Sequence, residues 1–117
     1  MKLIINDNIF KCRVCNSVDS IKEGMMNKTF QGFDSMLFLM PEKKRQSFWM
    51  YNCLIPLDIV MVDGNVITKI HSNCKPCDDQ YSCKSYTGFG DKVVELPGGS
   101  CRKLGIKEGD MVRTSLF

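Results

Sequence analysis

Short apolar runs alternate with polar, turn-forming residues along the whole chain. The runs are too short for amphipathic helices and rich in β-branched or aromatic residues, which is typical of strands. We expect the run at 35–40 to end at Pro41, because proline cannot donate to a strand ladder. The polar segment 72–90 is expected to be a long loop. The pattern predicts strands at 2–5, 9–15, 35–40, 57–62, 66–71 and 91–96. A last strand is expected after the turn at 107–110.

One pair of these runs predicts a hairpin. The segments 57–62 and 66–71 flank the turn 63–65, and its Asp-Gly pair is a strong signal for two paired strands. No strand–helix–strand repeat is present, so a doubly wound parallel sheet is not expected. The fold class is α+β and mostly β. We expect a small, strongly bent sheet or an incomplete barrel of short, mainly antiparallel strands with two short helices.

Capping residues place the two helices. Ser17 is a typical N-cap and Gly24 a typical stop, so a helix of at most two turns is expected between them. A second short helix is expected after the turn at 97–98 and should end near Gly105.

Composition narrows the class of protein. The chain has 117 residues, 44% of them apolar and 25% charged, which suits one globular domain over residues 1–117. A net charge of +3 and one basic run, 43–45, are too little for a broad nucleic-acid surface, so nucleic acid is not an expected partner. The N-terminal apolar run is too short for a signal peptide, and no stretch reaches the ~18 apolar residues of a membrane span. We therefore expect a cytoplasmic domain without membrane contact.

Seven cysteines are many for a reducing compartment. Cys12 and Cys15 form one Cys-x-x-Cys pair, and Cys74 and Cys77 form a second. Two such pairs can bind zinc through four thiolates arranged as a tetrahedron. Zinc is therefore a candidate cofactor, and these four cysteines are its candidate ligands.

Strand geometry opposes this metal site. If 9–15 is extended, side chains three positions apart point to opposite faces of the sheet. Both thiols of the first pair could then reach one ion only if the strand ends or bulges at Val14, so unrelated, partly buried thiols are the competing interpretation. Cys83 offers Cys77 a partner for a small-loop disulfide, or else supplies a further ligand.

Thiol chemistry is a third possibility. His71 is the only histidine, and either His71 or Asp58 could assist a cysteine nucleophile. The candidates for this nucleophile, only by elimination, are Cys53, Cys74 and Cys101. The motif Cys74-Lys-Pro-Cys77 has the proline of a redox motif but lacks the helix that activates its first thiol.

The stretch 47–60 places three polar or aromatic side chains in an apolar run: Trp49, Asn52 and Asp58. Pro56 should interrupt strand pairing, which leaves Asn52 and Asp58 on either side of a bend. There they can satisfy loose backbone groups or line a ligand pocket, and the two interpretations have similar weight. A buried Trp49 needs a partner for its indole N–H in either case.

The motifs SMLFLM (35–40), SFWMYNCLIPLDIVMVD (47–63), CKPCDDQYSCKSY (74–86) and VVELPGGSCRKLGIKEGDMV (93–112), together with GMM at 24–26, occur in this order. In this respect the chain resembles the small domain catalogued as domain of unknown function 192. The resemblance covers nearly the whole chain and implies one compact, mostly β domain without an established activity. The positions matching the family pattern include Gly24, Met26, Met36, Phe38, Trp49, Asn52, Pro56, Leu57, Asp58, Cys77, Cys83, Tyr86, Glu95, Leu96, Gly98, Gly109 and Asp110.

Departures from the family pattern concern the cysteines. Cys12, Cys15, Cys74 and Cys101 lie outside it, so a four-cysteine zinc site would be particular to this member. Many relatives look exported, which would suit a Cys77–Cys83 disulfide. The added cysteines and the bare N-terminus fit a microbial or phage member.

Three functions follow as hypotheses. The first is a non-enzymatic binding or accessory module, whose partner is a protein or a small-molecule ligand. Its polar–aromatic pocket would lie beside the cysteine-containing loop. The second is a zinc-stabilised structural or interaction protein, and the third a cysteine-dependent hydrolase or thiol-redox enzyme. The residues expected to bind the ligand are Trp49, Asn52, Asp58, Cys77, Cys83 and Tyr86.

Overall fold

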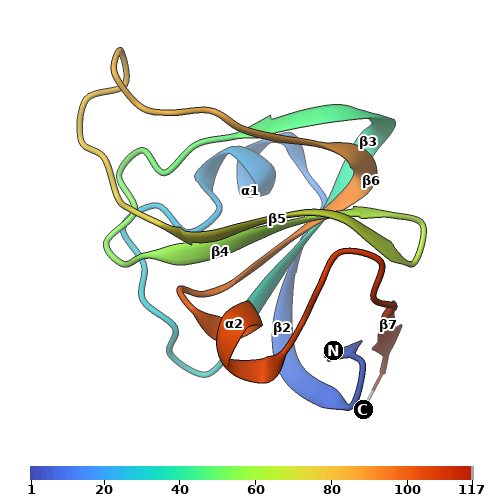
Figure 1. Ribbon diagram of the computed structural model, residues 1–117. Helices are drawn as coiled ribbons and strands as arrows, with labels where there is room; N and C mark the ends of the chain where they lie inside the picture. Colours follow the sequence, from blue (N-terminus) through green and yellow to red (C-terminus); the bar gives the residue numbers. More distant parts are fainter. Residues whose placement is uncertain (117) are drawn as a thin grey trace.

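Within residues 1–116, seven strands form one mixed sheet that curls into a half-barrel (Figure 1). The order across the sheet is β5-β4-β6-β3-β2-β1-β7, and β2 and β3 are parallel whereas the other neighbours are antiparallel. The mostly β, bent sheet with two short helices is thus confirmed. The computed structural model describes residues 1–116, with strands β1 (Lys2–Ile5), β2 (Asn8–Cys15), β3 (Ser35–Phe48), β4 (Leu57–Asp63), β5 (Val66–Cys74), β6 (Tyr86–Pro97) and β7 (Val112–Ser115), and helices α1 (Val18–Glu23) and α2 (Ser100–Leu104).

The two edges of the sheet are brought together by the segment that leads into β7. The N–H of Ile67 in β5 donates to the carbonyl of Asp110 at 3.0 Å, and the N–H of Gly109 donates to the carbonyl of Ile67 at 2.8 Å. One end of the edge strand β5 is therefore hydrogen-bonded rather than open to pairing with another chain.

Both faces of the central strands are buried. Along β4, Val60 and Val62 point into one core, and Ile59 and Met61 into the other. We call these the α2-side core, which includes Cys101 of α2, and the α1-side core, against which Ile21 of α1 packs. Burial on two faces explains why these strands are continuous apolar runs rather than alternating ones.

The two helices are capped as the sequence indicates. Ser17 accepts the N–H of Ser20 at 3.1 Å, the Ser20 hydroxyl accepts the N–H of Ser17 at 3.0 Å, and Gly24 follows the last turn. Gly105 ends α2 in a left-handed conformation. Neither helix within residues 1–116 has the length and apolar character that crossing a membrane requires.

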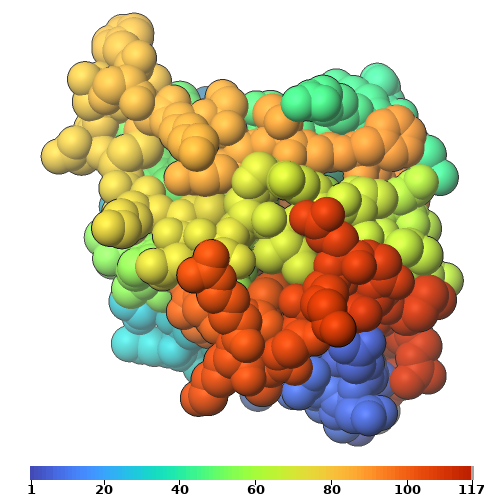
Figure 2. Space-filling model, viewed as in Figure 1, coloured from blue at the N-terminus to red at the C-terminus, as the bar shows by residue number. Residues whose placement is uncertain are grey.

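The structure corrects two predictions, the end of one strand and the extent of one loop. Strand β3 does not end at Pro41 but continues to Phe48, because its pairing with β6 shifts register between Leu39 and Lys44 and proline is tolerated at such an irregularity. The expected loop 72–90 is shorter, since β5 extends to Cys74 and β6 begins at Tyr86. The remaining loop projects from the body of the molecule (Figure 2). The interruption that Pro56 predicts is present, because residues 49–56 lie between the end of β3 at Phe48 and the start of β4 at Leu57.

Candidate functional site

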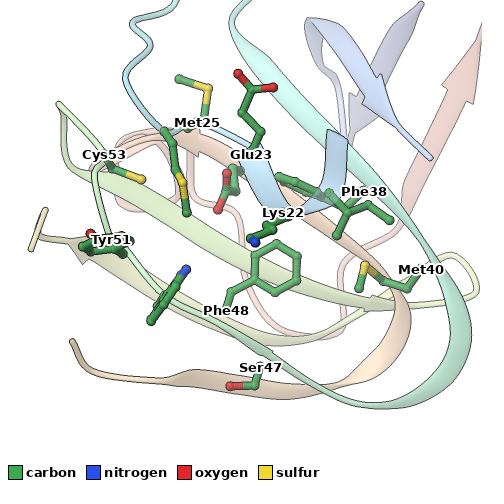
Figure 3. A pocket seen from close by; sticks show the side chains of 14 residues that line it. Lys22, Glu23, Met25, Phe38, Met40, Ser47, Phe48, Tyr51 and Cys53 are labelled. Carbon is green, nitrogen blue, oxygen red and sulfur yellow. The ribbon is translucent and has the colours of Figure 1, made fainter. Parts of the chain in front are cut away.

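A cavity of about 180 Å³ lies between α1, the end of β3 and the segment 49–53 (Figure 3). Aromatic rings and thioethers make up much of its wall, and three exposed polar residues, Lys22, Glu23 and Ser47, also line it. One buried acidic residue, Glu95 of β6, completes the lining. The principal apolar residues of the wall are Met25, Met26, Phe38, Met40, Phe48 and Trp49.

The shape of the cavity depends on two phenylalanines of β3. Phe38 and Phe48 lie on either side of the register shift in this strand, and their rings meet edge to face with centroids 4.9 Å apart. Gly24 allows α1 to end against the ring of Phe38. A Cβ at this position would lie 3.2 Å from Cζ of Phe38, and the φ of +44° is one that L side chains rarely adopt.

The segment 49–53 forms the opposite wall, and neighbours hold it on two sides. Asn52 accepts the N–H of Asn27 at 2.8 Å through its carbonyl, and its own N–H donates to the carbonyl of Cys77 at 3.0 Å. Trp49 and Tyr51 of this segment pack with ring centroids 5.1 Å apart. The wall is therefore fixed by the chain after α1 and by the loop that follows β5.

Glu95 is the unusual group of the site. It is 3% exposed, and its cross-strand neighbours are the apolar residues Met36 and Ile59. Its Oε1 is buried, and within residues 1–116 no hydrogen-bond partner contacts that atom. Burial raises the pKa of this carboxyl to about 8, because the apolar surroundings disfavour its charged form.

Asp58, also a candidate ligand residue, has a different environment. It is completely buried, and its carboxylate accepts the backbone N–H groups of Asn73, Gly99 and Cys101 at 2.7, 2.9 and 2.8 Å. It therefore connects the end of β5 to the start of α2. This carboxylate is occupied by backbone donors and does not line the cavity.

The other candidates lie around the cavity rather than together inside it. Trp49 lines it and is 39% exposed. Asn52 has φ 57°, which places it at a left-handed position, and it borders a separate shallow depression that Cys77 also lines. Cys77 and Cys83 form a disulfide. Tyr86 packs against His71 with centroids 5.3 Å apart.

The four cysteines considered for zinc are not brought together. Cys12 belongs to the α2-side core and Cys15 to the α1-side core, as expected for side chains three apart on a strand. Cys77 is oxidised in its disulfide with Cys83. In the part of the chain that the structure describes, no three acidic, cysteine or histidine residues form a group suited to a metal ion. The geometry does not support the zinc site.

The free thiols are not activated for catalysis. Burial raises the pKa of Cys53 and Cys101 to about 12 and that of Cys74 to about 11, and it also raises the pKa of Cys12 and Cys15. Reactive thiols have a pKa below the ordinary value of about 8.5. The imidazole Nε2 of His71 lies 2.8 Å from the carbonyl oxygen of Thr87, and Cys74 contacts the backbone carbonyl of His71 instead of its ring.

Sequence reasoning did not select Glu95 as a site residue. The signal was present, because a single glutamate interrupts the apolar run VVELP at 93–97. A charged residue is almost never fully buried unless it is paired. The missing partner becomes visible only when the neighbouring strands are known.

Comparisons with known proteins show which family the chain matches and which solved structures resemble it. The profile of domain of unknown function 192 (DUF192, described as "Uncharacterized ACR") matches residues 1–114. A comparison with curated proteins found no match. A protein of unknown function from Novosphingobium aromaticivorans DSM 12444 has a similar structure, with a TM-score of 0.84 and 29% identity over 97% of this chain and 84% of that one. A candidate transcription regulator from Sinorhizobium meliloti 1021 has the same fold, with a TM-score of 0.83 and 23% identity over 96% of this chain and 89% of that one. The chain belongs to the DUF192 family.

Proposed function

We propose that this protein is a non-enzymatic binding module and that its ligand site is the cavity between α1, β3 and the segment 49–53. One observation carries the proposal: the buried carboxyl of Glu95, one oxygen of which has no hydrogen-bond partner within residues 1–116, lines an otherwise largely apolar cavity. Burying such a group without a partner costs several kcal/mol of folding free energy. Ligand sites combine an apolar wall with a few polar groups that fix orientation, and Glu95 is suited to that role.

The chemistry of the cavity supports binding rather than catalysis. Cys53 is the thiol that lines it, and burial raises its pKa to about 12, so it is protonated and a poor nucleophile at neutral pH. Nucleophilic catalysis needs a base within hydrogen-bond reach of the thiol, and the only histidine is bound to the carbonyl of Thr87.

The partner is proposed to be a small molecule or the side chain of another protein. The similarity to the candidate regulator from Sinorhizobium meliloti concerns the fold alone and supplies no ligand. A cytoplasmic location and a microbial or phage origin remain expectations from the sequence. The Cys77–Cys83 disulfide does not favour the cytoplasm, because disulfides persist mainly in oxidising compartments.

The single tryptophan provides a direct test. Trp49 lines the cavity, so a bound molecule should change its fluorescence, and NMR of ¹⁵N-labelled protein should show shifts in 21–26 and 47–53 during a fragment screen. The variant Met26→Trp fills the cavity and should abolish these shifts, whereas Met111→Trp, at an exposed position outside it, should not. A screen in which no fragment shifts the cavity residues would refute the proposed site.

A further inference from the structure

We propose that the cavity selects organic ammonium cations, with the Phe38, Phe48 and Trp49 rings around the cationic group and the Glu95 carboxylate as its counter-charge. This inference rests on the proposed function, because it names the ligand class of the same site. It is carried by the combination of aromatic walls with a buried acidic group.

The first step concerns the aromatic wall. Phe38, Phe48, Trp49 and Tyr51 all line this cavity. The face of an aromatic ring attracts a cation, and several rings together recognise methylated ammonium groups. A neutral apolar ligand would gain from the same rings only through burial of its surface.

The second step concerns charge. Oε1 of Glu95 has no hydrogen-bond donor among residues 1–116, and no lysine or arginine of this part of the chain forms an ion pair with the carboxylate. A buried carboxylate is strongly unfavourable when it is left without a partner, and an accompanying cation lowers that cost. The ligand would thus supply the positive charge that the fold leaves out.

The third step concerns size. An apolar cavity of about 150 Å³ accommodates a benzene molecule. The cavity of about 180 Å³ is slightly larger and therefore suits a compact head group such as trimethylammonium. It is too small for a whole drug-sized molecule, which needs about 300 Å³ or more, so any longer tail would extend past the exposed residues Lys22 and Ser47.

Lys22 gives the proposal a second, opposite consequence. Its side chain lines the same cavity from α1 (Figure 3). A positive charge at this position repels a bound cation. Removing it should strengthen binding of an ammonium ion, whereas removing the Glu95 charge should weaken it.

Two probes of nearly equal shape test the inference. Choline and its neutral carbon analogue 3,3-dimethylbutan-1-ol are titrated against the full chain at pH 8, and the Trp49 fluorescence and the NMR shifts are followed. We expect choline to bind about tenfold more tightly than the alcohol. Glu95→Gln should reduce this preference by weakening the binding of choline more than that of the alcohol, and Lys22→Met should increase the affinity for choline several-fold. Thermal unfolding of each variant shows whether it is folded.

The outcomes show whether the proposed ligand class is wrong or the proposed site itself is wrong. Equal binding of the two probes overturns the cation preference, and a choline affinity unchanged by Glu95→Gln overturns the role of Glu95 as its counter-charge. In both cases the cavity remains a binding site. If choline does not bind but neutral fragments shift the cavity residues, the ligand class is again wrong and the proposed function stands. If neither probes nor fragments shift them, both proposals fail.

Discussion

The backbone N–H of Cys101 donates to the Asp58 carboxylate at 2.8 Å across a sequence separation of 43 positions. Two further backbone donors, Asn73 and Gly99, reach the same carboxylate. The fully buried Asp58 is thus satisfied, whereas an oxygen of the nearly buried Glu95 has no hydrogen-bond partner within residues 1–116. The first carboxylate holds two segments of the backbone together, and the second is the group that we propose to contact a ligand.

We expect Asp58→Ala to lower the free energy of unfolding by about 3 kcal/mol, because it leaves three N–H groups at the start of α2 and the end of β5 without their acceptor. Urea denaturation measures the change. Asp7→Ala is the matched control, since Asp7 is exposed in a turn and its loss should stay within about 0.5 kcal/mol. An Asp58→Ala protein as stable as this control would contradict the structural role.

Glu95 should make the stability dependent on pH. Burial raises the pKa of its carboxyl from 4.5 to about 8, so the folded state holds this proton more tightly than the unfolded state. The contribution to stability is therefore greatest below about pH 4.5 and is lost as the pH rises through about 8. We expect Glu95→Gln to unfold at a higher temperature than the unmodified protein at pH 9 and to differ little at pH 5.

Thermal unfolding across this pH range checks the expectation. The exposed Glu42 offers a control, because Glu42→Gln should leave the pH profile unchanged. Asp91 and Asp110 have lowered pKa values and contribute stability that is lost only as the pH falls below their ordinary value of 3.8, outside the window of Glu95. A flat difference between the Glu95→Gln protein and the unmodified one from pH 5 to pH 9 would mean that the carboxyl is not buried as described.

Asn52 should affect the stability of the fold through its backbone conformation. Its φ of 57° is a left-handed conformation, which asparagine and glycine tolerate better than other residues. We expect Asn52→Gly to be nearly neutral and Asn52→Ala to cost about 1 kcal/mol of unfolding free energy in urea denaturation. If both variants lose ligand binding at unchanged stability, the amide side chain itself is part of the site.

The disulfide should stabilise both the fold and the cavity. Closing the loop between Cys77 and Cys83, which are six positions apart, contributes about 2 kcal/mol by restricting the unfolded chain. Cys77 also donates its N–H to Met50 and accepts the N–H of Asn52, so its loop supports the wall that carries Trp49. We expect Cys77→Ser/Cys83→Ser to lower the melting temperature and to weaken fragment binding. A Cys12→Ser control should not affect binding, because Cys12 lies in the α2-side core.

The sequence predicted the hairpin β4–β5 and the helix cap at Ser17, since both depend on local turn and capping chemistry. It misplaced the end of β3, because whether a strand continues past Pro41 depends on the register shift opposite β6. The site residues likewise differ in how far the local sequence reveals them. Trp49 could be predicted as a site residue from its type and position. The apolar surroundings of the Glu95 carboxyl depend on Met36 and Ile59, which are distant in sequence.

The segment 49–53 forms one wall of the cavity outside the main ladder of the sheet, and α1 forms another (Figure 3). The exposed lining residues Lys22, Glu23 and Trp49 lie outside the paired strands, so replacing them should alter the cavity while the strand pairing that carries Glu95 is preserved. For protein engineering, the exposed lining residues can thus be varied separately from the sheet that positions Glu95. On the proposed function, the half-barrel would serve as a scaffold for receptors of chosen small molecules.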